Sequence, residues 1–203
     1  MAVTNKFGKS VTLLATTRDR IPTGVEGHSS DSRAVRIRAA EAADLAAITD
    51  IEFQSFSNPW QPDTFRSLLK QERAKVLVAE DPGAGVVGYT VLWWVFDQAE
   101  LANLAVRKDH QERGIGSFLL DQAITHAAAQ GVESLFLEVR MSNEPAYRLY
   151  SNRGFTQISV RKGYYQTPRE DARILVKHFT PASEIDDQVD GVVLDEEPFD
   201  HVG

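Results

Sequence analysis

The stretch Gln111-Glu112-Arg113-Gly114-Ile115-Gly116 decides the fold, because it joins an apolar run to a long amphipathic segment. Residues 100–106 before it are typical of a strand, and residues 114–130 after it predict a helix that ends at Gly131. Glycines here allow a tight turn and bring the backbone close to a ligand. The first turn of a helix carries unpaired N–H groups and a positive dipole end, which suits a pyrophosphate. Spacing alone equally allows a loop that only connects the two elements.

Two other kinds of phosphate-binding loop are excluded by the residues that follow the glycines. A Walker loop ends in Gly-Lys-Ser/Thr, whereas Gly116 precedes Ser117 and Phe118. A dinucleotide fingerprint needs a third glycine where Leu119 stands. Residues 83–88 match G-x-G-x-x-G literally, but they lead into a β-branched and aromatic run instead of a helix, so they predict a hairpin.

Apolar periodicity predicts further elements on both sides of the loop. Strands are expected at residues 35–38, 76–79, 86–96, 135–139, 155–160 and 172–176, and helices at residues 45–56, 63–70 and 143–152. The expected buried stripes are Leu45, Ile48, Ile51, Phe53 and Phe56 in the first helix, and Ile115, Phe118, Leu119, Ala123 and Ile124 in the long one. This order predicts an α/β fold, with a mixed sheet, helices on both faces and a parallel crossover around the long helix.

Length and charge indicate one principal domain with two extensions. The chain has 203 residues, and we expect the domain at residues 34–180. Residues 1–33 show no sustained period and predict a flexible extension, and residues 181–203 contain eight acids without Lys or Arg and predict a disordered acidic tail. Without the tail, 21 acids stand against 22 bases, so neither a nucleic-acid binder nor a membrane-surface protein is expected.

Composition also excludes several kinds of site. The chain has no cysteine, which excludes disulfides, thiolate metal ligands and a cysteine nucleophile. Its five histidines lack ligand-like spacing, so no metal site is expected. No apolar run approaches the ~18 residues of a membrane span, and the N-terminal apolar patch is shorter than the roughly 7–15 residues of a signal peptide, so a cytoplasmic protein is expected.

Two residues could carry proton transfer. Glu138 lies in an apolar strand, either half-exposed and paired with a neighbour such as Arg140, or as a carboxylate in a cleft that accepts a proton. Tyr150 lies on a predicted helix, where it either packs in the core or donates a proton to a leaving group.

Four other residues have both a structural and a binding interpretation. Asn143 stands just before a predicted helix, which N-capping explains adequately. Trp60, Tyr164 and Tyr165 fall in predicted loops, where they either pack or form walls for an extended peptide.

Four blocks, at residues 101–106, 111–116, 137–143 and 149–155, resemble the GNAT acetyltransferases in order and spacing. More narrowly, the chain is similar to the bacterial ribosomal-protein-alanine N-acetyltransferases through Asn58-Pro59-Trp60, Arg161-Lys162-Gly163-Tyr164-Tyr165 and Arg169-Glu170-Asp171-Ala172. The resemblance covers about residues 34–180. It implies the GNAT fold, a mostly antiparallel mixed sheet with a splayed parallel strand pair, and acetyl-CoA as co-substrate without a metal.

The resemblance also implies a role for particular residues. Glu138 would accept a proton from the substrate amine, and Tyr150 would donate one to the departing thiolate. Trp60, Tyr164 and Tyr165 would bind the substrate. The residues implied in binding acetyl-CoA are Leu104, Ala105, Val106, Gln111, Glu112, Arg113, Gly114, Ile115, Gly116, Ser117 and Asn143.

The implied reaction is direct attack of an amine on the thioester. The implied acceptor is the N-terminal α-amine of a protein, such as a small-subunit ribosomal protein that begins with alanine. Two alternatives remain open from the sequence: an acetyltransferase for small amines or lysine side chains, and an acetyl-CoA-binding module without catalysis.

Overall fold

The computed structural model describes residues 3–4, 10–11 and 35–179. Within the first 33 residues, β1 (Val3–Thr4) pairs antiparallel with β2 (Ser10–Val11). The rest of the expected N-terminal extension and the expected acidic tail at residues 181–203 lie outside the described residues.

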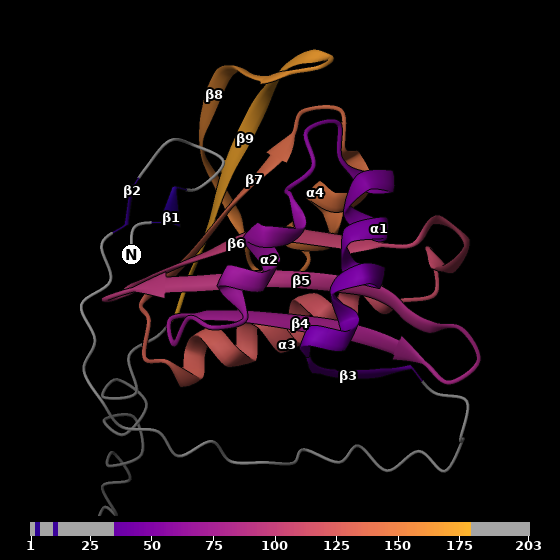
Figure 1. Ribbon diagram of the computed structural model, residues 1–203. Coiled ribbons are helices and arrows are strands. Elements are labelled where there is room, and N and C mark those ends of the chain that lie inside the picture. Colours follow the sequence, from indigo (N-terminus) through magenta and orange to yellow (C-terminus); the bar gives the residue numbers. More distant parts are fainter. Residues whose placement is uncertain (1–2, 5–9, 12–34, 180–203) are drawn as a thin grey trace, which may run out of the picture.

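A seven-stranded sheet forms the centre of the described domain, with the strand order β3-β4-β5-β6-β7-β9-β8 (Figure 1). Each neighbouring pair is antiparallel except β6 and β7, which are parallel. This arrangement confirms the predicted fold. The elements are β3 (Arg36–Ala39), η1 (Ala42–Asp44), α1 (Leu45–Ser55), α2 (Pro62–Leu68), β4 (Ala74–Asp81), β5 (Gly85–Val95), β6 (Gln98–Val106), η2 (Lys108–His110), α3 (Ile115–Ala129), β7 (Ser134–Arg140), α4 (Glu144–Ser151), β8 (Thr156–Gln166) and β9 (Arg169–His178).

Helices cover both faces of the sheet, with α1 and α2 on one side and α3 on the other (Figure 1). Helix α3 buries residues spaced by four, because that spacing keeps them on one face of the helix: Ile115, Leu119, Ala123 and Ala127. The prediction that Phe118 belongs to this stripe is wrong, since it is 56% exposed.

The predicted stripe of α1 also needs a correction. Phe53 is 49% exposed, whereas the neighbouring carboxylic acid Glu52 is completely buried. Position 52 follows Ile48 by one helical turn and so faces the sheet, while Phe53 is rotated by about 100°. Spacing alone did not separate these two adjacent positions.

The parallel pair β6–β7 separates part of the way along its length. The two strands pair only from Gln98–Ser134 to Glu100–Phe136, although β6 continues to Val106 and β7 to Arg140. A register shift against β5 then leaves Ala102 as an extra residue on β6. The bulge and the early end of pairing open a slot in the sheet, as the resemblance implied.

Strands β8 and β9 form a longer hairpin than the sequence predicted. Tyr164 and Tyr165 lie on β8, so the prediction that they fall in a loop is wrong. The regular pairing of β8 with β9 is interrupted between Arg161 and Tyr165. The sequence there lacks the alternating apolar pattern by which a strand is predicted. Gly163 within this bulge has φ of 57° and donates its N–H to Asp171 at 2.8 Å.

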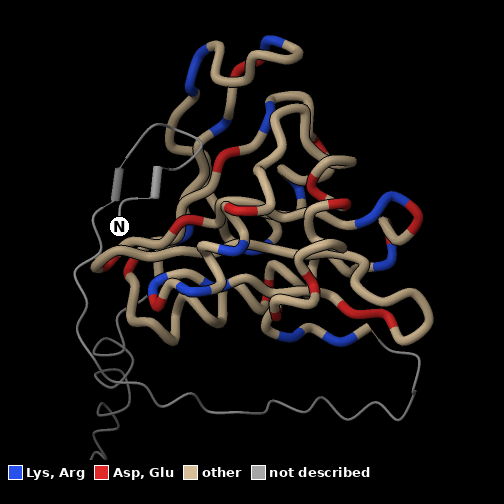
Figure 2. The backbone as a smooth tube through the Cα atoms, in the orientation of Figure 1, with Lys and Arg blue, Asp and Glu red and all other residues tan. Residues whose placement is uncertain are grey.

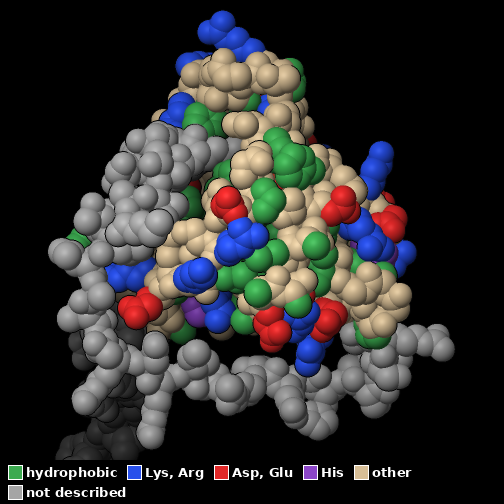
Figure 3. Space-filling model, viewed as in Figure 1, with side chains coloured by type: hydrophobic (Ala, Val, Ile, Leu, Met, Phe, Trp, Pro, Cys, Tyr) green, Lys and Arg blue, Asp and Glu red, His purple; other side chains and the backbone are tan. Residues whose placement is uncertain are grey.

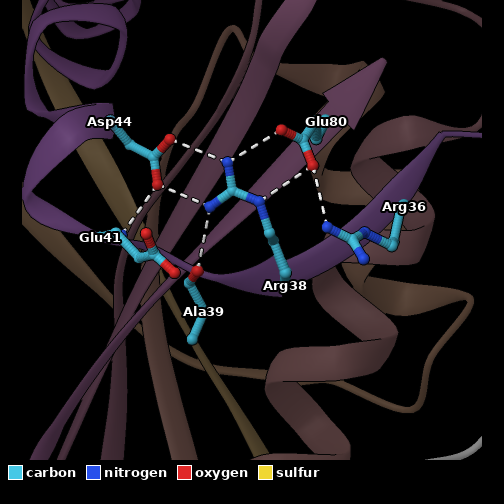
Figure 4. A network of polar contacts seen from close by, with 6 residues as sticks. All are labelled: Arg36, Arg38, Ala39, Glu41, Asp44 and Glu80. Carbon is cyan, nitrogen blue, oxygen red and sulfur yellow. Dashed lines mark hydrogen bonds and ion pairs between the residues drawn. The ribbon is translucent and has the colours of Figure 1, made fainter. Parts of the chain in front are cut away.

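At the opposite edge of the sheet, Arg38 fastens the short strand β3 to its neighbours (Figure 4). Its guanidinium donates to Asp44 at 2.7 and 2.9 Å and to Glu80 at 3.0 Å. Arg36 adds a bond to Glu80 at 3.2 Å. The hydrogen bonds from Arg38 favour the charged form of both carboxyls, so the pKa of Asp44 and that of Glu80 are lowered. We refer to these residues as the Arg38 clamp.

Charged residues of both signs are interspersed along the described chain, including the β8–β9 hairpin (Figure 2). On the face that carries α1 and α2, hydrophobic side chains are interrupted by acidic and basic ones (Figure 3). Among the helices of the described ranges, none is long and apolar enough to cross a membrane.

Candidate active site

A cavity of about 190 Å³ lies where β6 and β7 part. Its walls come from α1, β6, β7, α4 and β8, which are far apart in the sequence. Six residues singled out from the sequence line it: Leu104, Glu138, Asn143, Tyr150, Tyr164 and Tyr165. The fold therefore brings the two candidates for proton transfer into the same cavity.

Glu138 reaches this cavity from β7, where alternate residues face opposite sides of the sheet. Its side chain is 15% exposed and accepts a hydrogen bond from Arg161 on β8 at 2.7 Å. The hydroxyl of Tyr164 also interacts with the Glu138 carboxylate. The ion-pair partner is thus Arg161 and not Arg140, which instead pairs with Glu170 at 3.1 Å.

Tyr150 lies on α4 and is buried, with its ring edge-on to Phe155 at a centroid distance of 5.9 Å. Burial raises the pKa of the Tyr150 phenol, so the group stays protonated at neutral pH. Burial likewise raises the pKa of Tyr165 to about 12. For Tyr164, burial and the adjacent Glu138 carboxylate both raise the pKa.

The loop at residues 111–116 turns into α3 through two residues with positive φ, Glu112 at 63° and Gly114 at 79°. Gly114 caps the helix, whose first N–H groups have no partner within an α-helix. Backbone N–H groups that converge in such a turn form a concave anion site. The loop, with Arg113, Ile115, Gly116 and Ser117, therefore fits a bound pyrophosphate. The Glu112 side chain is exposed, which is compatible with a carboxylate in this loop.

Gln111 has a local role that the sequence did not suggest. Its side-chain amide donates to the carbonyl of Val106 at 2.9 Å and so braces the loop against the end of β6. The other edge of β6, at Leu104 and Ala105, lies beyond the last residue pair with β7. Its main-chain groups can pair there with an extended ligand.

Asn143 caps α4, accepting from the backbone N–H of Ala146 at 3.2 Å, and it also lines the cavity. The capping interpretation and a contact with a ligand are therefore compatible in one residue.

Trp60 is not among the residues that line the cavity. It is 9% exposed and stacks on Trp93 at 6.0 Å, next to Phe65. Its backbone N–H donates to Glu52 at 2.8 Å. The structure thus places it in the core that anchors the α1–α2 connection behind the cavity wall.

A buried polar network was missed from the sequence. The carboxylate of Glu52 accepts from the hydroxyl of Tyr89 and from the amide of Asn103 at 2.9 Å. Desolvation, followed by the Glu52 charge, raises the pKa of Tyr89. Asn103 lines the cavity beside the Ala102 bulge, so the network joins α1 and β5 to the parted strand. A carboxylic acid within an apolar helix stripe is the pattern that could have indicated it.

A second cavity of about 360 Å³ adjoins the first and shares Arg140, Tyr164 and Tyr165 with it. It lies between the α1–α2 connection and the β8–β9 turn. Arg140 spans these two segments, donating to Ser57 at 3.0 Å and to the carbonyl of Thr167 at 3.0 Å. Its guanidinium also lies 3.9 Å over the Tyr165 ring. The two cavities thus share walls, and Glu138 lines the first of them.

Within the part of the chain that the structure describes, no group of three or more His, Asp or Glu side chains could hold a metal ion. The cavity offers instead two carboxylates, Glu100 and Glu138, and three phenols. Such a set can bind an amine, accept its proton and protonate a leaving group.

Comparisons with known proteins agree with this geometry. The acetyltransferase (GNAT) family model matches residues 45–155. The ribosomal protein bS18-alanine N-acetyltransferase of Escherichia coli K12 is 35% identical over 141 residues, 68% of this chain and 94% of that protein. The crystal structure of the Escherichia coli ribosomal-protein-S18-alanine N-acetyltransferase has a TM-score of 0.67 and 34% identity, covering 73% of this chain and 96% of that one. Arabidopsis thaliana NAA60 in complex with acetyl-CoA shares the fold, with a TM-score of 0.66 and 17% identity over 72% of this chain and 100% of that one.

Proposed function

Because this chain belongs to the acetyltransferase (GNAT) family, we propose that it transfers the acetyl group of acetyl-CoA to the N-terminal alanine of ribosomal protein bS18. One observation carries the chemistry: the strand pair β6–β7 parts beside a cavity that contains both Glu138 and Tyr150. The identity of 35% to the Escherichia coli enzyme, over 94% of that protein, supports the acceptor.

Acetyl-CoA supplies the acetyl group as a thioester. The N–H groups at residues 112–117 hold its pyrophosphate at the start of α3, where the helix dipole favours a negative charge. The unpaired edge of β6 at Leu104, Ala105 and Val106 lies along the pantetheine arm, and Asn143 contacts it from α4. These assignments rest on the open strand edge and on the turn at Gly114.

In the proposed reaction, Glu138 accepts the proton that the acceptor ammonium must lose before its nitrogen can attack. The new bond joins that nitrogen to the acetyl carbon, the carbon–sulfur bond breaks, and the second proton that the nitrogen loses replaces the one that Tyr150 gives up. Tyr150 protonates the departing thiolate, a role supported by the raised pKa that keeps its phenol protonated. Tyr164 and Tyr165 form one wall of the acceptor route, and Ser57 and Asn58 of the α1–α2 connection line it as well, while Trp60 packs in the core against Trp93.

The identity of the amine matters for a single carboxylate base. An α-amino group has a pKa near 8 and a lysine side chain one near 10.4, so about a tenth of α-amines but under a thousandth of lysines are neutral at pH 7. An N-terminus therefore presents far more of the reactive form, which favours the α-amine as acceptor.

Labelled acetyl-CoA and a peptide with the N-terminal sequence of bS18 test the proposal. The controls are the same peptide with a blocked N-terminus, the peptide with an internal lysine only, and a polyamine. We expect label only in the peptide with a free N-terminal alanine. If only the polyamine or the lysine peptide were acetylated, the acetyltransferase activity would stand but the proposed N-terminal acceptor would be wrong. Calorimetry that detects no acetyl-CoA binding would point to a different activity altogether.

A further inference from the structure

The Glu138 carboxylate is already engaged by a cation from the chain itself. Arg161 donates to it at 2.7 Å, and its guanidinium lies 5.1 Å from the centre of the Tyr164 ring. The Arg161 side chain is 44% exposed, whereas that of Glu138 is 15% exposed. The exposed cation therefore contacts a carboxylate that also lines the cavity proposed for the acceptor.

The strand that carries Arg161 orients it for this contact. Strand β8 is the edge of the sheet, and its pairing with β9 is irregular between Arg161 and Tyr165. Asp171 holds this bulge from β9, accepting from Lys162 and from the Gly163 N–H, each at 2.8 Å. Residues 162–164 of β8 stand opposite Asp171 alone, so the regular alternation of side chains is interrupted there. The bulge thus allows Arg161 and Tyr164 to meet the same carboxylate.

Breaking the Arg161–Glu138 contact has a different free-energy cost for each of the two side chains. A carboxylate that is mostly buried is unfavourable without a cation or donors beside it. A guanidinium that is nearly half-exposed regains water when it leaves, so its departure is inexpensive. Glu138 consequently needs a cation in the resting protein, whereas Arg161 does not need Glu138.

We propose that Arg161 is a positioning residue that occupies the place of the acceptor ammonium on Glu138 and yields it when the acceptor binds. This inference rests on the proposed function and adds a step before the chemistry. The Arg161–Glu138 contact breaks, and the α-ammonium of the acceptor forms the new one. After transfer, Glu138 holds the proton, and the return of Arg161 favours its release to water, because a neighbouring cation stabilises the charged form.

Other charged and titratable groups line the same cavity. They are Glu100 on β6, Arg140 on β7, Tyr150 on α4, and Tyr164 and Tyr165 on β8. Arg140 is held by Glu170, Ser57 and two carbonyls of the β8–β9 turn. Arg161 donates directly to Glu138 at 2.7 Å, so substitution there tests the exchange.

The test compares Arg161→Met with Arg161→Lys in the full chain, using the bS18 N-terminal peptide. A resident competitor lowers the apparent affinity of the acceptor by the fraction of molecules that it leaves open. In Arg161→Met we expect the acceptor KM to fall about threefold to tenfold. The acidic limb of kcat/KM, which reports the free enzyme, should move to higher pH, because Arg161 no longer favours the charged carboxylate there, whereas the limb of kcat should not move. Arg161→Lys should keep values close to wild type.

The matched control is Arg36→Met, which removes the same charge at the opposite edge of the sheet. It should change neither the acceptor KM nor the pH profile. Calorimetric titration of the peptide into each protein with CoA bound measures acceptor affinity without turnover, and thermal melts confirm folding. An acceptor KM that rises or stays constant in a folded Arg161→Met overturns the exchange. If the wild-type protein acetylates no N-terminus, the proposed function is wrong. The peptide affinities measured by calorimetry then remain as the test of whether Arg161 competes with the acceptor.

Discussion

The two edge strands of the sheet each hold an arginine bound to carboxylates, and the two arginines have different surroundings. In the Arg38 clamp on β3, three guanidinium nitrogens donate to Asp44, Glu80 and a main-chain carbonyl, and the side chain is 22% exposed. Arg161 on β8 is 44% exposed and donates to Glu138, which lines a cavity. An arginine–carboxylate ion pair therefore holds β3 to the sheet at one edge, whereas at the other edge we propose that the acceptor ammonium replaces the arginine.

The difference lies in what each arginine leaves behind. If Arg38 departs, Asp44 remains with a side chain only 9% exposed and no other cation bound to it among the described residues. If Arg161 departs, a cationic acceptor can enter the place that it vacates. A salt bridge is thus structural where no other partner can reach it, and exchangeable where a cavity opens beside it.

Substitution of Glu138 and of Glu80, one carboxylate from each ion pair, should give the largest difference in kcat. Glu138→Gln keeps the shape but removes the proposed proton acceptor, so we expect kcat to fall about 10²–10⁴-fold. Acetyl-CoA affinity should stay constant, because Glu138 lies at the acceptor side of the slot. Initial rates with the bS18 peptide and calorimetry with acetyl-CoA measure the two quantities.

The matched variant is Glu80→Gln in the Arg38 clamp, which should lower the melting temperature and leave kcat unchanged. A wild-type rate in Glu138→Gln would reject the assignment of the base. Equal loss of rate in both variants would show that the carboxylates affect activity through folding alone.

The next largest effect is expected on stability. Arg38→Met leaves the largely buried Asp44 without its cation, which should lower the free energy of unfolding by about 2–4 kcal/mol. Arg161→Met should cost less than Arg38→Met, because it removes one bond to Glu138 instead of bonds to two carboxylates, although the Glu138 side chain is only 15% exposed. Urea unfolding followed by tryptophan fluorescence compares them. Similar losses in both variants would remove the distinction between a clamp and an exchangeable pair.

The parts of this fold that depend on local periodicity could be predicted from the sequence. A glycine at the start of α3 and apolar residues four positions apart, Ile115, Leu119 and Ala123, indicated the strand–loop–helix unit, and the structure confirms it. Two exposed phenylalanines were wrongly expected in the core, because neighbouring apolar positions on a helix cannot be separated without knowing where the sheet lies.

The cavity was predictable only in part, and mainly through the resemblance. Glu138, Tyr150 and Asn143 do lie together, and their chemical roles are for the substitutions above to test. Contacts distant in sequence escaped prediction: Asn103 lies 51 positions from Glu52, and Arg161 lies 23 positions from Glu138. A local rule therefore chose Arg140 as the partner of Glu138, although the strand pairing brings Arg161 there.

Acid should weaken the Arg38 clamp in a defined range of pH. The pKa values of Asp44 and Glu80 are lowered in the folded chain, chiefly by the hydrogen bonds from Arg38. A carboxyl with a lowered folded pKa contributes stability that is present above its unfolded pKa, near 4, and is lost as pH falls through the folded pKa. The difference in melting temperature between wild type and Arg38→Met should therefore be largest above about pH 5 and shrink below about pH 4. A difference that stays constant from pH 7 to pH 3 would contradict this origin.

The smallest effect is expected from Arg36, which belongs to the same clamp but is more exposed than either Arg38 or Arg161. Its side chain is 71% exposed and it bonds to Glu80 at 3.2 Å, while Glu80 keeps its bonds to Arg38 when Arg36 is replaced. Arg36→Met should therefore lower the free energy of unfolding by less than about 0.5 kcal/mol, within the range of exposed pairs. Urea unfolding beside Arg38→Met measures the difference. A loss comparable to that of Arg38→Met would mean that charge near Glu80, and not the geometry of one enclosed guanidinium, holds β3 to the sheet.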